Sequence, residues 1–172
     1  MGKEATIGLE RMFKEHNQSV FRLLCRLGAS PHDAEDIVQE TFIAANESLS
    51  SFKGESTLRT WIISIAYNKL RNHRRSGAKR YEIEELVETF EDKRLPPDEL
   101  LVQRETIRRL YRVLKHLPEE ICDTFMMATF GGYSDHAELA SVLGINPGTV
   151  ATRINRVREA LKVERKAMEG KQ

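Results

Sequence analysis

Cysteine is scarce in this sequence, and long hydrophobic runs are missing. Cys25 and Cys122 lie far apart, and neither has a cysteine or histidine neighbour at metal-ligand spacing. We therefore expect two buried free thiols rather than a disulfide or a redox pair. No apolar run approaches the length that spans a bilayer, and residues 1–11 lack the apolar core of a signal peptide. The sequence thus predicts a cytoplasmic protein with no direct insertion into a membrane.

An overall excess of one charge is also missing, because the formal net charge is +1. The charges are instead sorted into blocks along the chain. Residues 30–50 contain acids and no lysine or arginine, whereas residues 53–80 contain many bases and Glu55 as their one acid. Residues 82–99 are acidic again, and residues 153–171 have a basic excess. This alternation indicates basic surfaces for nucleic acid and acidic surfaces for a different partner.

The alternating pattern of a β-strand is absent, because apolar residues recur at helical spacing almost throughout. The longest apolar stripe begins after Ser30-Pro31, which is a helix start signal. A polar stretch at 50–57 interrupts the pattern, and residues 82–99 combine acidity with Pro96-Pro97 and a weak apolar pattern. We expect an all-α protein with two small helical domains joined by a flexible acidic linker. The expected boundaries are 1–80 and 104–172 for the domains and 81–103 for the linker.

Residues 146–158 carry the strongest local signal, a capped helix with one apolar and one polar stripe. Asn146 suits the N-cap, and Pro147 suits the first helical position, where its missing N–H costs nothing. The apolar stripe comprises Val150, Ile154, Val157 and Leu161, and the opposite stripe comprises Thr149, Thr152, Arg153 and Arg156. Upstream, residues 134–143 predict a short helix and Gly144-Ile145 a tight turn. Together they predict a helix-turn-helix whose hydroxyls and guanidiniums suit a DNA major groove. A structural hairpin with a basic rim would give the same pattern.

An acidic stripe runs along the predicted helix that follows Ser30-Pro31. Its members recur at helical spacing on the face opposite the apolar stripe, and they are Asp33, Asp36, Glu40 and Glu47, with Gln39 adjoining. An ordinary solvated face would show the same pattern, since acids are favoured near a helix N-terminus. The alternative is a docking face for a basic groove on another protein.

A second basic surface is predicted on the helix that spans residues 61–75. One face presents Ser64, Asn68, Arg71 and Arg75, and Tyr67 and Arg74 flank it. The preceding loop, residues 50–57, offers hydroxyls, a glycine and an aromatic ring, which together suit a pocket for an unstacked base. Trp61 falls on the apolar stripe, so we expect it in the core. A solvated basic face is the alternative for the remaining bases.

These three surfaces, in this order, give the chain a resemblance to the extracytoplasmic-function (ECF) group of bacterial sigma factors. Residues 33–42 resemble the group's polymerase-binding helix in region 2. Residues 52–56, followed by 60–62 and 65–68, resemble the segment that melts and reads the −10 promoter element. Residues 143–150 with Arg153 and 156–161 resemble the region 4 helix that reads the −35 element. The resemblance covers nearly the whole chain except the linker and the ends.

The resemblance implies an alternative sigma factor that binds core RNA polymerase and directs promoter-specific initiation. The implied partners are core polymerase, through its β′ clamp and β subunits, promoter DNA and an anti-sigma factor. The residues implied to face the coiled coil of the β′ clamp are Asp33, Asp36, Gln39 and Glu40.

For the −10 element, the resemblance implies a flipped base held by the loop, through Phe52, Lys53 and Ser56, together with Asn68. The surrounding backbone would be gripped by Arg71, Arg74 and Arg75. The implied −35 contacts are Thr149, Thr152, Arg153, Asn155 and Arg156.

Two positions depart from the pattern of the group. Ala151 stands where many relatives carry lysine or arginine, so one contact to DNA is lost. Asp135-His136 fills an apparent extra residue in the first helix of the predicted helix-turn-helix, which leaves the start of that helix open.

Three other functions compete with the sigma-factor interpretation. A stand-alone helix-turn-helix regulator would explain the C-terminal domain but would leave the acidic helix and the loop without a role. A protein that mimics a sigma factor to sequester a regulator would not need Arg71 or Arg153. An enzyme is the weakest alternative, because the histidines are scattered along the chain. We therefore expect no catalytic residue, metal, cofactor or small-molecule substrate.

Overall fold

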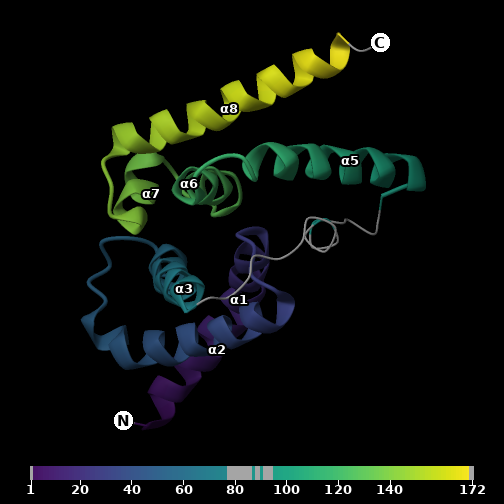
Figure 1. Cartoon of the computed structure of the whole chain (residues 1–172). Helices are drawn as coiled ribbons and strands as arrows, with labels where there is room; N and C mark the ends of the chain where they lie inside the picture. The colour runs from purple at the N-terminus through teal and green to yellow at the C-terminus, as the bar shows by residue number, and fades with distance from the viewer. Residues whose placement is uncertain (1, 77–86, 88–89, 91–94, 171–172) are drawn as a thin grey trace. The chain divides into compact units, whose positions relative to one another are not determined.

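The computed structural model describes residues 2–76, 87, 90 and 95–170 (Figure 1). These residues form helices, turns and loops, and no strand occurs among them, which confirms the prediction of an all-α protein. The chain divides into two compact units, Met1–Tyr81 and Glu82–Gln172, here called the N-terminal and the C-terminal unit. Most of the predicted acidic linker, including residues 81–86 and 91–94, lies outside the described residues. Within the described part of the chain, no helix is long and apolar enough to cross a membrane.

The N-terminal unit is built from helices that pack against one another. Its elements are α1 (Gly2–Arg26), α2 (Pro31–Ser48), the short 3-10 helix η1 (Leu49–Ser51) and α3 (Leu58–Arg75). Both α1 and α3 contact α2, and they also contact each other. The stripe that α2 buries is Ala34, Ile37, Val38, Thr41, Phe42 and Ala45, as its spacing in the sequence predicts. Burial of this stripe leaves the opposite face of α2 at the surface.

Side-chain caps fix where α2 and α3 begin. Ser30 is the N-cap of α2, with Pro31 in the first helical turn, which confirms the start signal in the sequence. Thr57 caps α3 by accepting a hydrogen bond from the backbone N–H of Thr60 at 3.1 Å. Because the caps fix both starts, the residue faces of α2 and α3 follow directly from the sequence.

The C-terminal unit contains the predicted helix-turn-helix. Its elements are α5 (Pro97–Leu114), α6 (Glu119–Phe130), α7 (His136–Leu143) and α8 (Pro147–Glu169). In Figure 1, α8 runs along the unit, and it contacts α5, α6 and α7. Val150, Ile154 and Val157 are buried, as the apolar stripe predicts. The Asn146 side chain caps α8 by accepting from the Gly148 N–H at 2.8 Å.

The helix α5 begins at Pro97, seven residues before position 104, where we expect the C-terminal domain to begin. Pro97 occupies the first turn, and two acids, Asp98 and Glu99, complement the helix dipole there. The proline pair is therefore a helix start as well as a linker signal. Phe90, inside the predicted linker, packs edge-to-face on Phe130, with ring centroids 5.4 Å apart.

Asp135 and Glu138 determine where α7 begins. The helix begins at His136, two residues after the predicted Ser134, because Asp135 is its N-cap and accepts from the Glu138 N–H at 2.8 Å. Ser134 donates from both its backbone N–H and its hydroxyl to Glu138 Oε2. These reciprocal bonds form a capping arrangement, which accommodates the extra residue without disturbing α7.

Gly144 forms the turn between α7 and α8 with a φ of 66°. Its N–H and that of Ile145 donate to the carbonyls of Ser141 and Ala140, which ends α7 with a left-handed glycine. An added Cβ meets no atom within 4 Å, so only the backbone conformation opposes a side chain at this position. Gly144→Ala should therefore lower the free energy of unfolding of the C-terminal unit by about 1–2 kcal/mol. Thermal unfolding followed by circular dichroism measures the change.

The matched control for this prediction is Gly170→Ala. Gly170 has a φ of −79°, and an added Cβ would lie 3.6 Å from the carbonyl oxygen of Lys166, which is an ordinary contact. This variant should unfold like the parent protein. Equal destabilisation by both substitutions would contradict the conformational explanation.

Both cysteines are free and buried, as the sequence predicts. Burial raises the pKa of the Cys25 thiol to about 11, so the thiol is protonated near neutral pH. The Cys122 thiol donates to the carbonyl of Leu114 at 3.1 Å and so links α6 to the end of α5. These thiols therefore contribute to packing within each unit.

Candidate functional site

The acidic stripe of α2 divides into exposed and shielded residues. Asp36 and Glu40 expose 59% and 61% of their side chains, and Gln39 is also exposed. Asp33 exposes 27% of its side chain. The structure therefore brings Asp36, Gln39 and Glu40 together on one accessible face, while Asp33 lies partly covered at the start of the helix.

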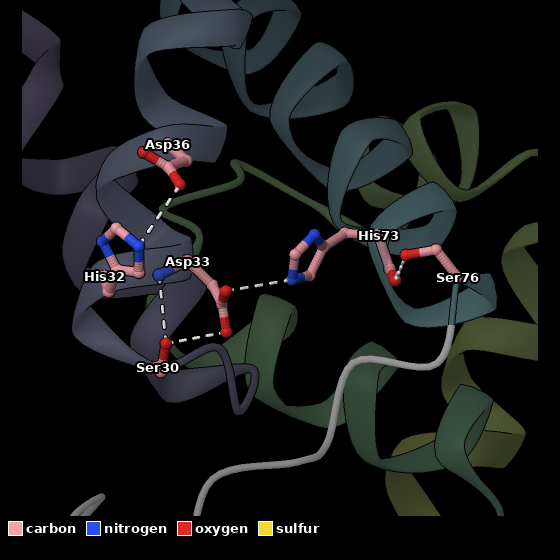
Figure 2. Close-up of polar contacts among 6 residues, drawn as sticks. All are labelled: Ser30, His32, Asp33, Asp36, His73 and Ser76. Carbon is pink, nitrogen blue, oxygen red and sulfur yellow. Dashed lines mark hydrogen bonds and ion pairs between the residues drawn. The ribbon is translucent and has the colours of Figure 1, made fainter.

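Two of these acids pair with α3 inside the same unit. Glu40 Oε2 lies 3.2 Å from Lys69 Nζ, and Asp33 Oδ1 lies 3.2 Å from His73 Nε2 (Figure 2). The Glu40–Lys69 pair is largely solvent-exposed, so it contributes little to stability and leaves Glu40 accessible. Periodicity within α2 cannot reveal either pair, because both partners belong to another helix.

The basic face of α3 lies largely at the surface. Asn68, Arg71 and Arg75 are exposed, and the Arg71 guanidinium lies 6.0 Å from the centroid of the Tyr67 ring. Arg74 differs, because its Nη2 donates a hydrogen bond to the carbonyl of Leu27, next to the end of α1. The structure thus separates Arg74, which anchors α3, from its exposed neighbours.

The loop between η1 and α3 places an aromatic pair beside exposed polar groups. The Phe52 and Trp61 rings lie 5.0 Å apart between centroids and are inclined at 37°. Trp61 is half-buried rather than fully in the core, because it is covered from one side by Phe52. Lys53 is exposed and Ser56 is half-buried. The loop therefore combines a cation, a hydroxyl and an aromatic surface next to α3.

The exposed face of α8 presents part of the predicted DNA-reading set. Thr152, Asn155 and Arg156 are exposed, and Thr149 is half-buried. The Thr152 hydroxyl donates to the carbonyl of Gly148 at 2.9 Å, which leaves its oxygen free to accept from another donor. Ala151 is half-buried, and it adds no charge to this face.

Arg153 is directed toward α6 rather than outward with the rest of its stripe. Its Nη1 donates to Thr124 Oγ1 at 3.1 Å and to the carbonyl of Glu120 at 3.4 Å. The Thr124 hydroxyl in turn donates to the same carbonyl at 2.6 Å. Arg153 therefore joins α8 to α6 within the C-terminal unit.

A groove beside the acidic face was not predicted from the sequence. It has a volume of about 690 Å³ and is lined by Glu10, Phe13, Lys14, Gln39, Phe42, Ile43, Asn46 and Glu47. Ile43 exposes 60% of its surface, and the Phe13 and Phe42 rings contact each other edge-to-face at 5.0 Å. An apolar residue outside the buried stripe, such as Ile43, is the one signal of this groove in the sequence.

Comparison with known proteins accounts for both units. The family description Sigma-70 region 2 matches residues 12–80, and Sigma-70, region 4 matches residues 107–161. The ECF RNA polymerase sigma-E factor of Salmonella typhimurium is 32% identical over 138 residues, which are 75% of this chain and 72% of that relative. The chain belongs to the ECF sigma factors.

Other relatives of this ECF sigma factor agree with the assignment. The RNA polymerase sigma-H factor of Pseudomonas aeruginosa is 29% identical over 156 residues, covering 86% of this chain and 80% of the relative. The solved structure of CnrH in complex with the cytosolic domain of CnrY has a TM-score of 0.65 at 23% identity, and it covers 94% of this chain and 90% of that chain. A sigma factor RpoE from Bartonella quintana, solved with the anti-sigma factor NepR, has a TM-score of 0.69 at 19% identity, with 91% and 96% covered. These two structures share the fold.

The family identifies the activity of the chain. It is an alternative sigma factor, which directs promoter-specific initiation by RNA polymerase. The region 2 match ends just beyond α3, and the region 4 match extends from α5 into α8. Both surfaces with exposed bases therefore lie in regions of the family, and a stand-alone regulator or a sigma mimic is not favoured. Sigma factors as a family are not enzymes.

Proposed function

We propose that the exposed acidic face of α2 binds the coiled coil of the β′ clamp of RNA polymerase. Asp36, Gln39 and Glu40 supply accessible carboxylates and an amide on one face. Asp33, implied as a fourth contact by the family resemblance, lies at the covered end of this face. Exposed carboxylates attract a basic partner from a distance and set its orientation, which suits a docking surface.

The loop at 52–56 and the exposed face of α3 form the proposed reader of the −10 element. Asn68 offers both a donor and an acceptor to the edge of an unstacked base, and Lys53 and Ser56 lie in the adjoining loop. Phe52 contributes an aromatic surface that Trp61 supports. Arg71 and Arg75 contact the surrounding phosphates. Capture of a flipped base offsets an unstacking cost of a few kcal/mol per step, so melting needs no chemical fuel.

The exposed face of α8 forms the proposed reader of the −35 element. Thr152, Asn155 and Arg156 face the major groove, and the partly covered Thr149 lies at the start of the helix. Arg153 acts mainly through its bonds to α6, which hold α8 at a fixed orientation. The single observation that carries the proposal is that one chain exposes an acidic helix and two separate basic helices, as a protein that joins an enzyme to DNA at two points requires.

The domain roles and the remaining partner are part of the same proposal. Residues 1–80 serve as region 2, residues 104–172 as region 4, and residues 81–103 as the link between them. An anti-sigma factor binds this chain, as the anti-sigma factor NepR binds the sigma factor RpoE in the solved complex. The protein acts in the cytoplasm, where the polymerase is, and it catalyses no reaction of its own.

Two asparagines provide a matched test of the two promoter contacts. Asn68→Ala should lower open-complex formation on an intact promoter by about 5- to 150-fold, the equivalent of about 1–3 kcal/mol for one base contact. Its effect should largely disappear on a template with an abasic site at the captured base. Permanganate reactivity of unpaired thymines measures the open fraction.

Asn155→Ala is the control, because Asn155 is equally exposed but lies on α8. It should weaken binding to the upstream element, and the abasic site should lower its open-complex formation as much as it lowers that of the parent protein. An effect of Asn68→Ala that is the same on intact and abasic templates would contradict the proposed pocket.

A further inference from the structure

The last turn of α3 is joined to the start of α2 and the end of α1 at two consecutive residues. His73 Nε2 lies 3.2 Å from Asp33 Oδ1, and Arg74 donates to the Leu27 carbonyl. Figure 2 shows the His73 ring directed across the space between the helices toward the Asp33 carboxylate. Two successive side chains therefore hold the end of α3 to the turn between α1 and α2.

Both oxygens of Asp33 are engaged within the unit. Oδ2 accepts a hydrogen bond from the Ser30 hydroxyl at 2.7 Å, and that hydroxyl accepts from the Asp33 backbone N–H at 3.0 Å. These bonds cap α2, and the carboxylate also lies favourably in the first turn of the helix. Oδ1 then faces His73. The Asp33 side chain thus connects the cap of α2 with the last turn of α3.

The His73 ring forms the other side of this contact. Its Nε2 is shielded from solvent and makes no hydrogen bond with the described residues, so the Asp33 carboxylate is its close charged neighbour. The 3.2 Å distance between His73 Nε2 and Asp33 Oδ1 is that of an ion pair. At the other end of the residue, the His73 carbonyl accepts from the Ser76 hydroxyl at 2.6 Å, which caps α3. His73 is therefore held through both its ring and its backbone.

A second ion pair, Glu40–Lys69, joins the same two helices. Moving seven residues along α2 from Asp33 to Glu40 corresponds to moving four residues back along α3 from His73 to Lys69. Glu40 exposes 61% of its side chain, whereas Asp33 exposes 27%. Loss of the Asp33 contact would remove one of the two contacts that hold the end of α3, next to Arg71 and Arg75.

We propose that Asp33 and His73 are positioning residues that align the DNA-binding face of α3 with the polymerase-binding face of α2. This inference rests on the proposed role of α3 at the −10 element. It assigns Asp33 a different role from that of Asp36 and Glu40, because its carboxylate is occupied inside the unit. A direct polymerase contact by Asp33 would require it to leave the α2 cap and His73.

The test is a double-mutant cycle with Asp33→Asn and His73→Gln in reconstituted polymerase. The asparagine retains an oxygen for the Ser30 hydroxyl, so the cap of α2 remains possible. Each single variant should lower open-complex formation by about 3- to 10-fold. The double variant should open the promoter no less than the more impaired of the two single variants. The affinity for core polymerase should change less than about twofold, and His73→Lys should retain opening because lysine places a cation beside the Asp33 carboxylate.

The matched control is His32→Gln. His32 Nε2 lies 3.8 Å from Asp36 Oδ2, so this pair has the same chemistry as Asp33–His73 but lies wholly on the surface of α2. The control should open the promoter normally. Additive effects of Asp33→Asn and His73→Gln, or a loss of polymerase affinity with Asp33→Asn alone, would overturn the inference.

The result with Asn68→Ala separates the two possible failures. If Asn68→Ala impairs opening but the Asp33 and His73 variants do not, the positioning role is wrong and the −10 reader stands. If none of these variants impairs opening, the proposed role of α3 itself is wrong. Thermal unfolding of each variant is monitored by circular dichroism. Promoter opening is then compared at a temperature at which every variant is folded.

Discussion

Arg156→Ala should reduce transcription from a promoter with an intact −35 element by about 5- to 150-fold. A guanidinium that contacts a guanine edge is worth about 1–3 kcal/mol of discrimination, and Arg156 is the exposed cation at the centre of the α8 face. Ala151 adds no charge to this face and the Arg153 guanidinium bonds to α6, so the face depends more strongly on Arg156. The check is competition binding of the reconstituted holoenzyme to promoters with single substitutions in the upstream element. It measures both the loss of promoter affinity and the relaxed base specificity.

Arg158→Ala is the matched control for Arg156→Ala. Arg158 is also exposed on α8, but it lies two residues further along and therefore points away from the proposed DNA face. Its removal should weaken binding slightly and equally for all sequences, since it can contribute only long-range attraction. Equal losses with both variants would mean that α8 supplies charge but no base recognition.

Ile154→Ala should lower the free energy of unfolding of the C-terminal unit by about 2–5 kcal/mol, the usual cost of removing a buried branched side chain. Ile154 is buried on the face of α8 opposite Arg156. The substitution creates a cavity under α8 and leaves the exposed residues of α8 unchanged. Chemical unfolding followed by circular dichroism measures the loss, and upstream binding should fall as the unit unfolds.

Val163→Ala controls for the loss of aliphatic surface on the same helix. Val163 is exposed, so its truncation should change the stability by less than about 0.5 kcal/mol. Comparable destabilisation by the two variants would contradict the packing of α8 on α6 and α7. Normal stability of Ile154→Ala would contradict it as well.

Helical spacing in the sequence predicts the buried faces of this protein well. Most of the apolar stripes of α2 and α8 is buried as expected, although Leu161, predicted in the α8 stripe, is half-buried. Ser30, Thr57 and Asn146 cap helices because their side chains satisfy free N–H groups locally. These features depend on residues a few positions apart. They can therefore be inferred without knowing how the helices pack.

Contacts between helices could not be inferred in the same way. Arg153 shares a stripe with Thr152 and Arg156 in the sequence, yet its guanidinium bonds to α6, 29 residues away at Thr124. Arg74 likewise bonds to Leu27, 47 residues away. A stripe shows which residues share one face of a helix but not which neighbouring helix lies beside that face. Long arginine side chains reach across to such a neighbour. The contact of Asp33 with His73 on α3 could likewise not be inferred from the sequence.

The charge blocks follow from the same architecture. Acidic residues on α2 and basic residues on α3 belong to one small unit, so a near-neutral chain can present surfaces of opposite sign. Pairs such as Glu40–Lys69 lie at the boundary between these surfaces. Charge composition alone would have hidden the acidic and the basic surface, whereas charge order along the chain indicated both.

Run-off transcription tests the central claim most directly. Core RNA polymerase is incubated with a template library randomised over the upstream and downstream elements, with and without this chain, and the transcripts are sequenced. We predict transcripts only when the chain and core polymerase are both present, from templates enriched at both elements, whereas the isolated chain binds promoter duplex weakly. Tight sequence-specific binding without polymerase, together with no selected transcript, would contradict the account and favour a stand-alone regulator.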